Sequence, residues 1–478
     1  MAERLATLVG IYALLGLGYQ IVFGQLRALN LAQGALFGVG AYATALTAPH
    51  LGSLAFVVST LAAVAVAAIA AGPILRLQSH YFALATLALA SLINLVALHA
   101  EAWTGGANGL VGFASELPRG TMLLATVWAI LIPSVVAYAA VFRGATGEKA
   151  RLLRDAPLVA ASLGIDAPLW RFISFVVGGA CAGLAGGFSA ALTGVVSPEA
   201  TGFSVMLLCL TSVVVGGARH PLGAVLGAAV AVLVPELFRG LQGSWLLAYA
   251  AATLAMVLWA PEGLAGLLSR ASAPPVPALP PHIAPVPGPQ LLVLDRVSKR
   301  FGGVEALAGV SFSVARGEIV GLIGPNGSGK TTLLNTISGL ERADSGTIAL
   351  DGIHLERLPA PAIARLGVGR TFQAPIDGET RTDGLARALA TGAAFLLLDE
   401  PAAGMTDRER EGLARLLGRL RDAGRGVILV DHDVDLLTRI CDRLVCLDGG
   451  KVIAAGSPAE VRSDARVRAS FLGVPVPA

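Results

Sequence analysis

Residues 324–332 combine the residue types that bind a nucleotide phosphate. They read GPNGSGKTT and lie between an apolar run and two leucines, so a glycine loop joins a strand to a helix. That context is what the phosphate-loop pattern G-x-x-x-x-G-K-[ST] requires. The glycines let backbone N–H groups turn toward a phosphate, Lys330 brings a positive charge to the β and γ oxygens, and the Thr331 hydroxyl can hold Mg²⁺.

We therefore predict that this loop binds ATP with Mg²⁺. A chance glycine-rich turn is the alternative, and it is disfavoured because the full motif stands in the right context. The predicted nucleotide-binding residues of the loop are Gly324, Pro325, Asn326, Gly327, Ser328, Gly329, Lys330, Thr331 and Thr332.

Two carboxylates end the apolar strand FLLLDEP, which begins at Phe395. Asp399 is expected to hold Mg²⁺, mostly through water. Glu400 is expected to orient and deprotonate an attacking water, a task that requires a carboxylate within hydrogen-bond reach. A strand capped by surface acids is the alternative, and the phosphate loop elsewhere in the chain argues against it.

The segments around these groups predict alternating strands and helices. LLVLDRVSKRF and ALAGVSFSVARGEIVGLIG form strands that lead into the loop, and LVCLDGGKVIAAG forms a hairpin that turns at Gly449 and Gly450. Thr406 and Glu409 make a capping box ahead of a helical leucine stripe. GVILVDHDVDLL is a buried strand that delivers His432, although a lone histidine after a strand is usually structural.

Composition divides the chain into a membrane half and a soluble half. Of the 478 residues, 55% are hydrophobic and 14% charged. Residues 1–270 hold 12 Lys or Arg and 9 Asp or Glu, whereas residues 271–478 hold 23 of each. The net charge of +3 gives no reason to propose a nucleic-acid partner, and the four cysteines lack the spacing of a metal site or a disulfide framework.

Apolar runs long enough to cross a bilayer recur through the first half. We predict about nine spans, the seventh and eighth being short. They cover residues 5–26, 28–48, 51–75, 81–100, 122–142, 172–196, 203–217, 222–238 and 245–260.

Basic residues orient the spans. Residues 143–171 carry five Lys or Arg, whereas residues 101–120 carry only Arg119. Cytoplasmic loops are enriched in Lys and Arg, so the first loop is expected inside and the second outside. Alternation from there places residues 261 onward, including the phosphate loop, in the cytoplasm, and the N-terminus outside.

Two segments of the first half have more than one interpretation. The second span contains Asn30, Gln33 and three glycines, so it either lines a transport path or packs closely through small residues. The loop stretch EKARLLRDAPLVAASLGID is amphipathic, and its place opposite an ATPase domain favours a contact helix over a solvated one. Residues 271–290 hold eight prolines and are predicted to be a semi-rigid linker, with a docking site as the weaker alternative.

The first half resembles the permease subunits of branched-chain amino acid ABC importers. The resemblance covers most of residues 10–265 and rests on YFALATLALASLINLVAL, TGGANGLVG, the run from RLLRDAPLVAASLGID to CAGLAGGFSAALTGVVSPEA, and SVVVGGARHPLGAVLGAAVAVLVPELFR. It implies a translocation subunit that pairs with a second permease and receives substrate from an extracytoplasmic binding protein. GYQIVFGQLRALNLAQGALFGVGAY is similar to the other permease of such a pair.

The second half resembles the ABC ATPases of the same importers over residues 291–373 and 385–474. The resemblance implies a polytopic α-helical membrane domain (1–270) fused to an α/β P-loop ABC-type nucleotide-binding domain (291–478). It assigns Phe301 to the adenine ring, although by residue type alone Phe301 would more often be core. It makes Gln373 a magnesium ligand that acts in catalysis, and His432 a contact to the γ-phosphate. PAAGM, which begins at Pro401, resembles the loop by which two such subunits sense each other.

The pattern breaks between Gln373 and Asp399. ABC ATPases carry there a helical subdomain with an LSGGQ-like signature, whereas only 26 positions separate the two residues here and no signature lies between them. GLARALATGAAFLLLDEP resembles the segment downstream of the signature, so residues 373–385 mark an internal deletion. Because the signature of one subunit completes the site of the other, this chain offers the first half of an ATP site and not the second.

The sequence supports three hypotheses. The preferred one is an import subunit in a prokaryotic cytoplasmic membrane, whose site is completed by a second ABC ATPase with an intact signature. The second is a degenerate or shortened subunit that binds ATP without coupled transport. The third is a membrane-tethered ATP sensor, which leaves the spans unexplained. Branched-chain amino acids fit as substrates, and Asn30, Gln33, Asn94, Thr104 and Asn108 are weak candidates for contacts with them.

Overall fold

The computed structural model of the 478-residue chain describes residues 1–75, 77, 80–237, 254, 258–259, 263–268, 291–372 and 381–472. Its contacts divide the chain into two compact units. Unit 1 comprises Met1–Arg154 and Ala167–Ala273, and unit 2 comprises Asp155–Asp166 and Pro274–Ala478. The predicted linker, residues 271–290, lies outside the described residues.

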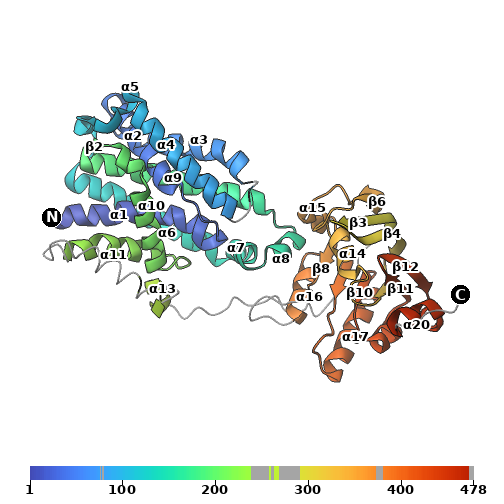
Figure 1. The fold of residues 1–478 in the computed structure, drawn as a ribbon. Coiled ribbons are helices and arrows are strands. Elements are labelled where there is room, and N and C mark those ends of the chain that lie inside the picture. The colour runs from blue at the N-terminus through green and yellow to red at the C-terminus, as the bar shows by residue number, and fades with distance from the viewer. Residues whose placement is uncertain are drawn as a thin grey trace. The chain divides into compact units, whose positions relative to one another are not determined.

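Unit 1 is a bundle of apolar helices with a small two-stranded ladder (Figure 1). Its α-helices are α1 (Ala2–Tyr19), α2 (Gln33–Leu51), α3 (Ala55–Ile74), α4 (His80–His99), α5 (Glu101–Thr104), α6 (Gly120–Arg143), α7 (Ala145–Asp155), α9 (Ala167–Thr193), α10 (Phe203–Gly216), α11 (Gly223–Leu237) and α13 (Gly263–Leu268). Its other elements are a π-helical turn (Gln20–Gly24), the 3₁₀ turns Gly52–Leu54, Gly106–Asn108, Ala114–Glu116 and Pro198–Thr201, and the antiparallel strands β1 (Leu110–Val111) and β2 (Val195–Val196).

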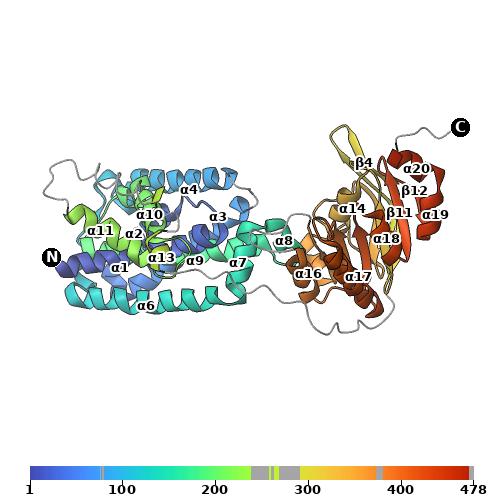
Figure 2. The ribbon, with the colours of Figure 1, turned by 90° about the horizontal axis from the view of Figure 1, so that it is seen from below.

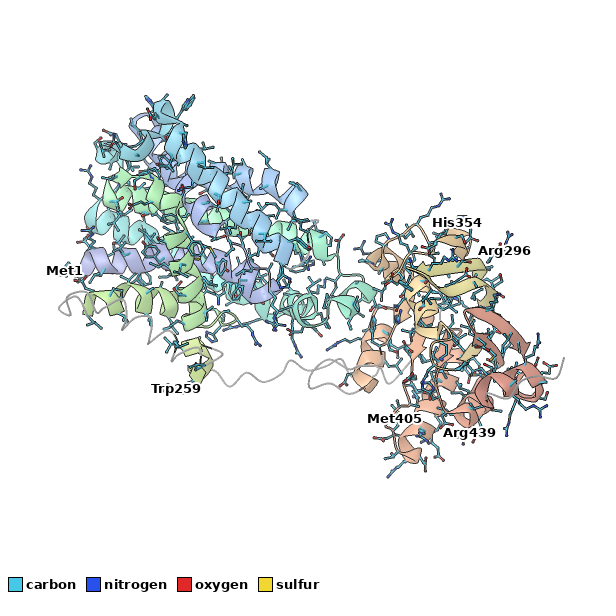
Figure 3. The ribbon with its side chains drawn as sticks, viewed as in Figure 1. Met1, Trp259, Arg296, His354, Met405 and Arg439 are labelled. Carbon is cyan, nitrogen blue, oxygen red and sulfur yellow. The ribbon has the colours of Figure 1, made fainter. Side chains whose placement is uncertain are left out.

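Five helical stretches of the described residues are long and apolar enough to cross a membrane. They are Ala2–Gly24, Gln33–Ile74, His80–His99, Gly120–Arg143 and Ala167–Thr193, and α10 and α11 are shorter apolar helices. Many large apolar side chains of unit 1 face outward, among them Met1 and Trp259, which Figure 3 labels. The first eight predicted spans thus fall on apolar helices, and most of the ninth, residues 245–260, lies outside the described residues.

Close backbone approach holds the centre of this bundle. Helix α9 packs against α1, α2 and α3, and α1 also lies beside α6 and α11 (Figures 1 and 2). A Cβ added to Gly40 of α2 would overlap the backbone of Gly183 in α9, and one added to Gly183 would meet Ala63 and Ser59 of α3. Helices in lipid gain little from apolar burial, so such small-residue contacts carry their association.

The glycine-rich second span therefore serves close packing. Asn30 and Gln33 are fully buried, and they satisfy each other and the backbone. Asn30 Nδ2 donates to Gln33 Oε1 at 3.1 Å, and Gln33 Nε2 donates to the Gly178 carbonyl at 2.9 Å. The transport-path interpretation of these two side chains loses its support, because their hydrogen-bonding groups are engaged within the bundle.

Unit 2 is an α/β domain with two sheets. The six-stranded sheet has the order β12-β11-β5-β10-β9-β8, and it is parallel except for the β11–β12 hairpin. A four-stranded antiparallel sheet has the order β4-β3-β6-β7. The strands are β3 (Leu291–Phe301), β4 (Val304–Ala315), β5 (Ile319–Ile323), β6 (Ser345–Leu350), β7 (Ile353–His354), β8 (Val368–Arg370), β9 (Phe395–Asp399), β10 (Gly426–Val430), β11 (Arg443–Asp448) and β12 (Lys451–Gly456).

Helices complete unit 2, and several begin at the signals that the sequence contains. They are α8 (Pro157–Ser162), α14 (Lys330–Ile337), α15 (Ala360–Arg365), α16 (Arg381–Ala390), α17 (Asp407–Asp422), α18 (Val434–Ile440), α19 (Pro458–Ser463) and α20 (Ala465–Leu472). The predicted capping box of Thr406 and Glu409 is present at the start of α17, and the predicted hairpin turns at Gly449 and Gly450. Strands β5, β9 and β10 are buried at every position, as strands covered on both faces must be.

The amphipathic loop stretch forms two helices. Ala156 has non-helical backbone (φ −144°, ψ +70°), and Pro157 starts the second helix, so α7 and α8 are separate. Pro157 lacks the N–H that a continuous helix would use, which explains the break. Within unit 2, α8 contacts α15, and the Gly164 carbonyl accepts a hydrogen bond from Arg365 Nη2 at 3.2 Å. This placement agrees with the expected contact helix.

The Gly40 contact gives a test of the packing in unit 1. Gly40→Leu should destabilise the bundle by about 1–3 kcal/mol or prevent its folding, because overpacking forces backbone shifts. Gly72→Leu in α3 is the matched control, since a Cβ there meets nothing within 4 Å. Thermal unfolding of the detergent-solubilised chain measures both. Equal melting temperatures for the two variants would contradict this packing.

Candidate functional site

Four parallel strands of unit 2 end at one edge of the six-stranded sheet. Strands β8, β9, β10 and β5 are neighbours, with Arg370 opposite Leu397, Asp399 opposite Val430 and Val430 opposite Leu322. Side chains that follow the carboxyl ends of parallel strands share one crevice. The sheet therefore brings together the phosphate loop after β5, Thr371 after β8, the acids that end β9, and His432 after β10.

The phosphate loop has the backbone that a phosphate requires. Gly327 and Gly329 have φ of +81° and +101°, in the left-handed region that other residues avoid. A Cβ on Gly329 would overlap the Ala306 carbonyl oxygen. Helix α14 begins at Lys330 and has no side-chain cap, so its first N–H groups are open to an anion.

Lys330 is buried in its own loop, with 7% of its surface exposed. Its Nζ donates to the carbonyl oxygens of Gly324 at 2.7 Å and Pro325 at 2.8 Å. Burial lowers the pKa of Lys330, and the Glu400 and Asp399 carboxylates oppose that shift. Ser328 Oγ is buried and has no hydrogen-bond partner among the described residues, so it is available to a ligand.

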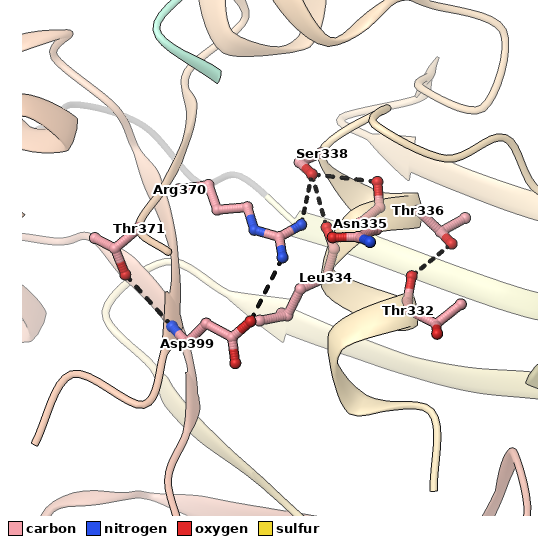
Figure 4. A network of polar contacts seen from close by, with 8 residues as sticks. All are labelled: Thr332, Leu334, Asn335, Thr336, Ser338, Arg370, Thr371 and Asp399. Carbon is pink, nitrogen blue, oxygen red and sulfur yellow. Dashed lines mark hydrogen bonds and ion pairs between the residues drawn. The ribbon is translucent and has the colours of Figure 1, made fainter. Parts of the chain in front are cut away.

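Asp399 lies in a buried polar network (Figure 4). Arg370 Nη2 lies 3.5 Å from Asp399 Oδ2, and both side chains are 2% exposed. The Asp399 N–H lies 3.4 Å from Thr371 Oγ1, and Arg370 Nη1 donates to Ser338 Oγ at 3.0 Å. Burial raises the pKa of Asp399 more than Arg370 lowers it, and burial lowers the pKa of Arg370 to about 10, so the guanidinium stays charged at neutral pH.

These residues fit a divalent cation. Asp399 Oδ1 is buried and has no hydrogen-bond partner among the described residues, and an orphaned carboxylate oxygen is costly unless a cation or its water occupies it. Thr331 is exposed at the start of α14, on the helix that the phosphate loop begins. A carboxylate and a hydroxyl are ligands that suit Mg²⁺. Gln373, the other predicted ligand, lies outside the described residues.

Glu400 and His432 form a pair at the open side of the site. His432 Nε2 lies 2.7 Å from Glu400 Oε1, and the two side chains are 53% and 20% exposed. Glu400 has φ of +50°, a strained value for a residue with a side chain, and its N–H donates to the Val430 carbonyl at 2.8 Å. The contact brings together the predicted general base and the predicted phosphate-sensing histidine.

Phe301 lies at the end of β3 with 46% of its surface exposed, so it is not a core residue. Lys299 Nζ lies 5.3 Å from the centroid of the Phe301 ring. An exposed ring is compatible with the predicted contact to adenine, which stays a prediction.

Three polar residues of the site were missed at the level of sequence: Arg370, Ser338 and Asp431. Asp431 is 6% exposed, and its carboxylate accepts from the Ala402 and Asp433 N–H groups at 3.1 and 3.0 Å. It thereby holds the PAAGM loop to the end of β10. A charged residue at the end of each apolar strand was the available signal for Arg370 and Asp431.

Unit 1 contains an open cavity of about 380 Å³ between α2, α4 and α10. Mostly apolar side chains line it, together with Ser91, Asn94 and Thr201. Asn94 Nδ2 donates to Thr201 Oγ1 at 2.7 Å and to the Pro198 carbonyl at 3.0 Å. Of the five polar residues proposed as weak substrate contacts, Asn94 is the one that lines this cavity.

The chain matches three family models. The model described as "Branched-chain amino acid transport system / permease component" matches residues 1–260, more than half of the 478 residues. The model "ABC transporter" matches residues 307–382. The model "Branched-chain amino acid ATP-binding cassette transporter" matches residues 451–476.

Curated relatives match the second half. The high-affinity branched-chain amino acid transport ATP-binding protein LivG of Salmonella typhimurium is 31% identical over 249 residues, with 38% of this chain and 98% of that protein covered. The lipopolysaccharide export system ATP-binding protein LptB of Haemophilus influenzae is 30% identical over 234 residues, with 38% and 97% covered. An alignment of 249 residues uses only 38% of this chain, so LivG has several dozen residues without a counterpart here.

Solved structures of ATP-binding cassettes also match. One, in its ADP conformation, has a TM-score of 0.36 at 24% identity, with 38% of this chain and 99% of that chain covered. A nucleotide-free cassette has a TM-score of 0.36 at 23% identity, with 38% and 98% covered.

The permease match and the apolar helices make this a membrane protein. The match to the ABC transporter model and to the ATP-binding relatives shows that the chain binds and hydrolyses ATP, and it implies further subunits and a transported substrate. The chain therefore belongs to the branched-chain amino acid transport system permease family, and the same polypeptide carries an ABC ATPase domain.

Proposed function

We propose that this chain is a fused permease and ATPase subunit that imports branched-chain or related hydrophobic amino acids across the cytoplasmic membrane of a prokaryote. One observation carries the proposal: a phosphate loop and the acids of a hydrolytic site share one sheet edge, in a chain whose other half belongs to the permease family. Residues 1–270 form the membrane domain, residues 271–290 the linker and residues 291–478 the ATP-binding domain.

In the proposed reaction, the phosphate loop holds the β- and γ-phosphates of ATP, and Lys330 moves from its carbonyl partners to the phosphate oxygens. Thr331, Asp399 and Gln373 would hold Mg²⁺, which would neutralise charge on the γ-phosphoryl group. Glu400 accepts the proton of the attacking water. His432 Nε2 lies 2.7 Å from Glu400 Oε1 and orients that carboxylate, and the imidazole would contact the γ-phosphate.

The ATP site needs a second subunit. Strand β8 ends at Arg370 and β9 begins at Phe395, and no signature sequence lies between them in the chain. The donors that a signature supplies to the γ-phosphate must come from a separate ABC ATPase. We further propose a second permease and an extracytoplasmic substrate-binding protein as partners, with no role for nucleic acid.

The distribution of basic residues supports the orientation. Five basic residues lie within or just beside the segment that joins α6 to α9 and contains α7 and α8, which favours a cytoplasmic position for that segment. They are Arg143, Lys149, Arg151, Arg154 and Arg171. The ATP-binding domain belongs on the same side, since its nucleotide is there.

A degenerate subunit that binds ATP without transport is the second candidate, and the missing residues relative to LivG favour it. The helix α8, in the loop between spans, still contacts α15 of the ATP-binding unit, which favours retained coupling. Substrate uptake by the assembled transporter separates the two, because only the first predicts ATP-dependent uptake.

Lys330→Ala tests the hydrolytic role. ATP turnover of the co-purified assembly should fall about 100-fold, as expected when a key donor to a developing charge is lost. Because this chain lacks a signature, alanine at the partner's own phosphate-loop lysine should change turnover little. Lys451→Ala, at the exposed β11–β12 hairpin, is the control within the chain. Unchanged turnover in Lys330→Ala removes the catalytic claim.

Glu400→Gln tests the general base. ATP binding should persist while turnover falls roughly 10²- to 10⁴-fold, the range for a lost acid–base group. His432→Ala should cause a smaller loss. His354→Ala is matched, because His354 also contacts a carboxylate, Glu356, at 3.1 Å but lies on β7 (Figure 3). A turnover loss in His354→Ala equal to that in His432→Ala would rule out a specific role for the Glu400 pair.

A further inference from the structure

Arg370 is an unusual residue for its position. It ends β8, a strand whose three residues are all buried, and only 3% of its surface is exposed. A buried guanidinium cannot lose its charge at neutral pH and must be paired within the domain. Arg370 is neither a predicted contact of the nucleotide nor a predicted ligand of the cation.

The guanidinium joins two elements of the ATP site (Figure 4). Nη2 faces Asp399 Oδ2 at 3.5 Å, and Nη1 donates to Ser338 Oγ at 3.0 Å. Ser338 caps the C-terminal end of α14, where its hydroxyl donates to the Leu334 carbonyl at 2.8 Å. Arg370 therefore connects the acid at the end of β9 with the helix that begins at Lys330.

The two carboxylate oxygens of Asp399 have different surroundings. Oδ2 faces the guanidinium, whereas Oδ1 is buried with no partner among the described residues. A carboxylate held at one oxygen cannot rotate freely, so the other oxygen keeps a fixed direction. Outer partners of this kind orient metal ligands in proteins.

We propose that Arg370 is a positioning residue that fixes the Asp399 carboxylate so that Oδ1 is presented to the divalent cation of the bound nucleotide. The inference rests on the proposed binding of Mg²⁺ with ATP and adds a residue to it. Arg370 itself touches neither the cation nor the phosphates; it acts through Asp399.

The residues that follow Arg370, and the strand β8 that it ends, make further contacts around the Arg370–Asp399 pair. Thr371 comes directly after Arg370, and its Oγ1 lies 3.4 Å from the Asp399 N–H. Phe372, whose ring centroid lies 5.0 Å from the guanidinium carbon, precedes Gln373. Strand β8 also contacts α15 and α8.

Binding of ATP to the full-length chain in detergent tests the proposal. Calorimetry with ATP in excess EDTA, and then with increasing Mg²⁺, separates nucleotide affinity from the cation's contribution. In Arg370→Met the Mg²⁺ concentration for half-maximal effect should rise at least about tenfold, as for lost outer partners of metal ligands. The affinity for ATP in EDTA should stay within about twofold of wild type, and Arg370→Lys should recover part of the Mg²⁺ effect.

Arg425→Met is the matched control. Arg425 is also buried, at 6% exposure, and donates to the Ala393 carbonyl, but it precedes β10 at the opposite end of that strand from Asp431 and His432. Its loss should leave the Mg²⁺ response of ATP binding unchanged. The double variant Arg370→Met/Asp399→Asn guards against simple misfolding, because it removes the unpaired buried charge; it should recover thermal stability without recovering the Mg²⁺ response.

Two results would overturn the inference: an unchanged Mg²⁺ response in Arg370→Met, or an equal loss of ATP affinity with and without Mg²⁺. The proposed function fails separately. An assembly that shows no ATP-driven uptake, while its Mg²⁺ response still depends on Arg370, would contradict the import function and leave the positioning role in place.

Discussion

Buried charge at one edge of a parallel sheet is the constraint on which the ATP-binding half depends. Lys330, Arg370 and Asp399 expose 7%, 3% and 3% of their surfaces. Removing a charge from water costs several kcal/mol unless partners replace the solvent. Lys330 donates hydrogen bonds to two carbonyl oxygens, and Arg370 pairs with Asp399 and donates to Ser338. One oxygen of Asp399 and the hydroxyl of Ser328 remain without partners among the described residues, where a phosphate and its cation would supply them.

A different constraint applies to the membrane half, because burial of apolar surface does not drive the association of helices in lipid. Glycines on α2 and α9 let the two backbones meet, and the polar side chains of Asn30 and Gln33 are satisfied within the bundle. The cavity beside Asn94 combines apolar walls with a few polar groups, the usual composition of a small-molecule site.

Local sequence patterns predicted the elements, whereas contacts between distant segments had to come from the fold. The capping box at Thr406, the hairpin at Gly449 and the strand before the phosphate loop were predicted, because each depends on a few neighbouring residues. The pairing of Arg370 with Asp399 joins two strands and could not be inferred from either alone. The break at Ala156 depends on one proline within a stretch whose periodicity continues across it. The second span could either line a transport path or pack closely against other helices. The choice depends on whether its glycines face another backbone, and the spacing of residues in the sequence does not show that.

The shortened connection between β8 and β9 is compatible with an intact core for a geometric reason. Neighbouring parallel strands need a crossover of about a dozen residues or more, usually with a helix. Here α16 provides that helix, and its contacts with β8 keep it on the sheet. The register of β8 with β9 is regular from Val368 to Arg370, so the acid at the end of β9 keeps its place beside Thr371. Although no signature sequence lies between β8 and β9, the described residues still bring the phosphate loop, Asp399, Glu400 and His432 to one edge of the sheet. Under the proposed function, the remaining contacts to the γ-phosphate come from another subunit.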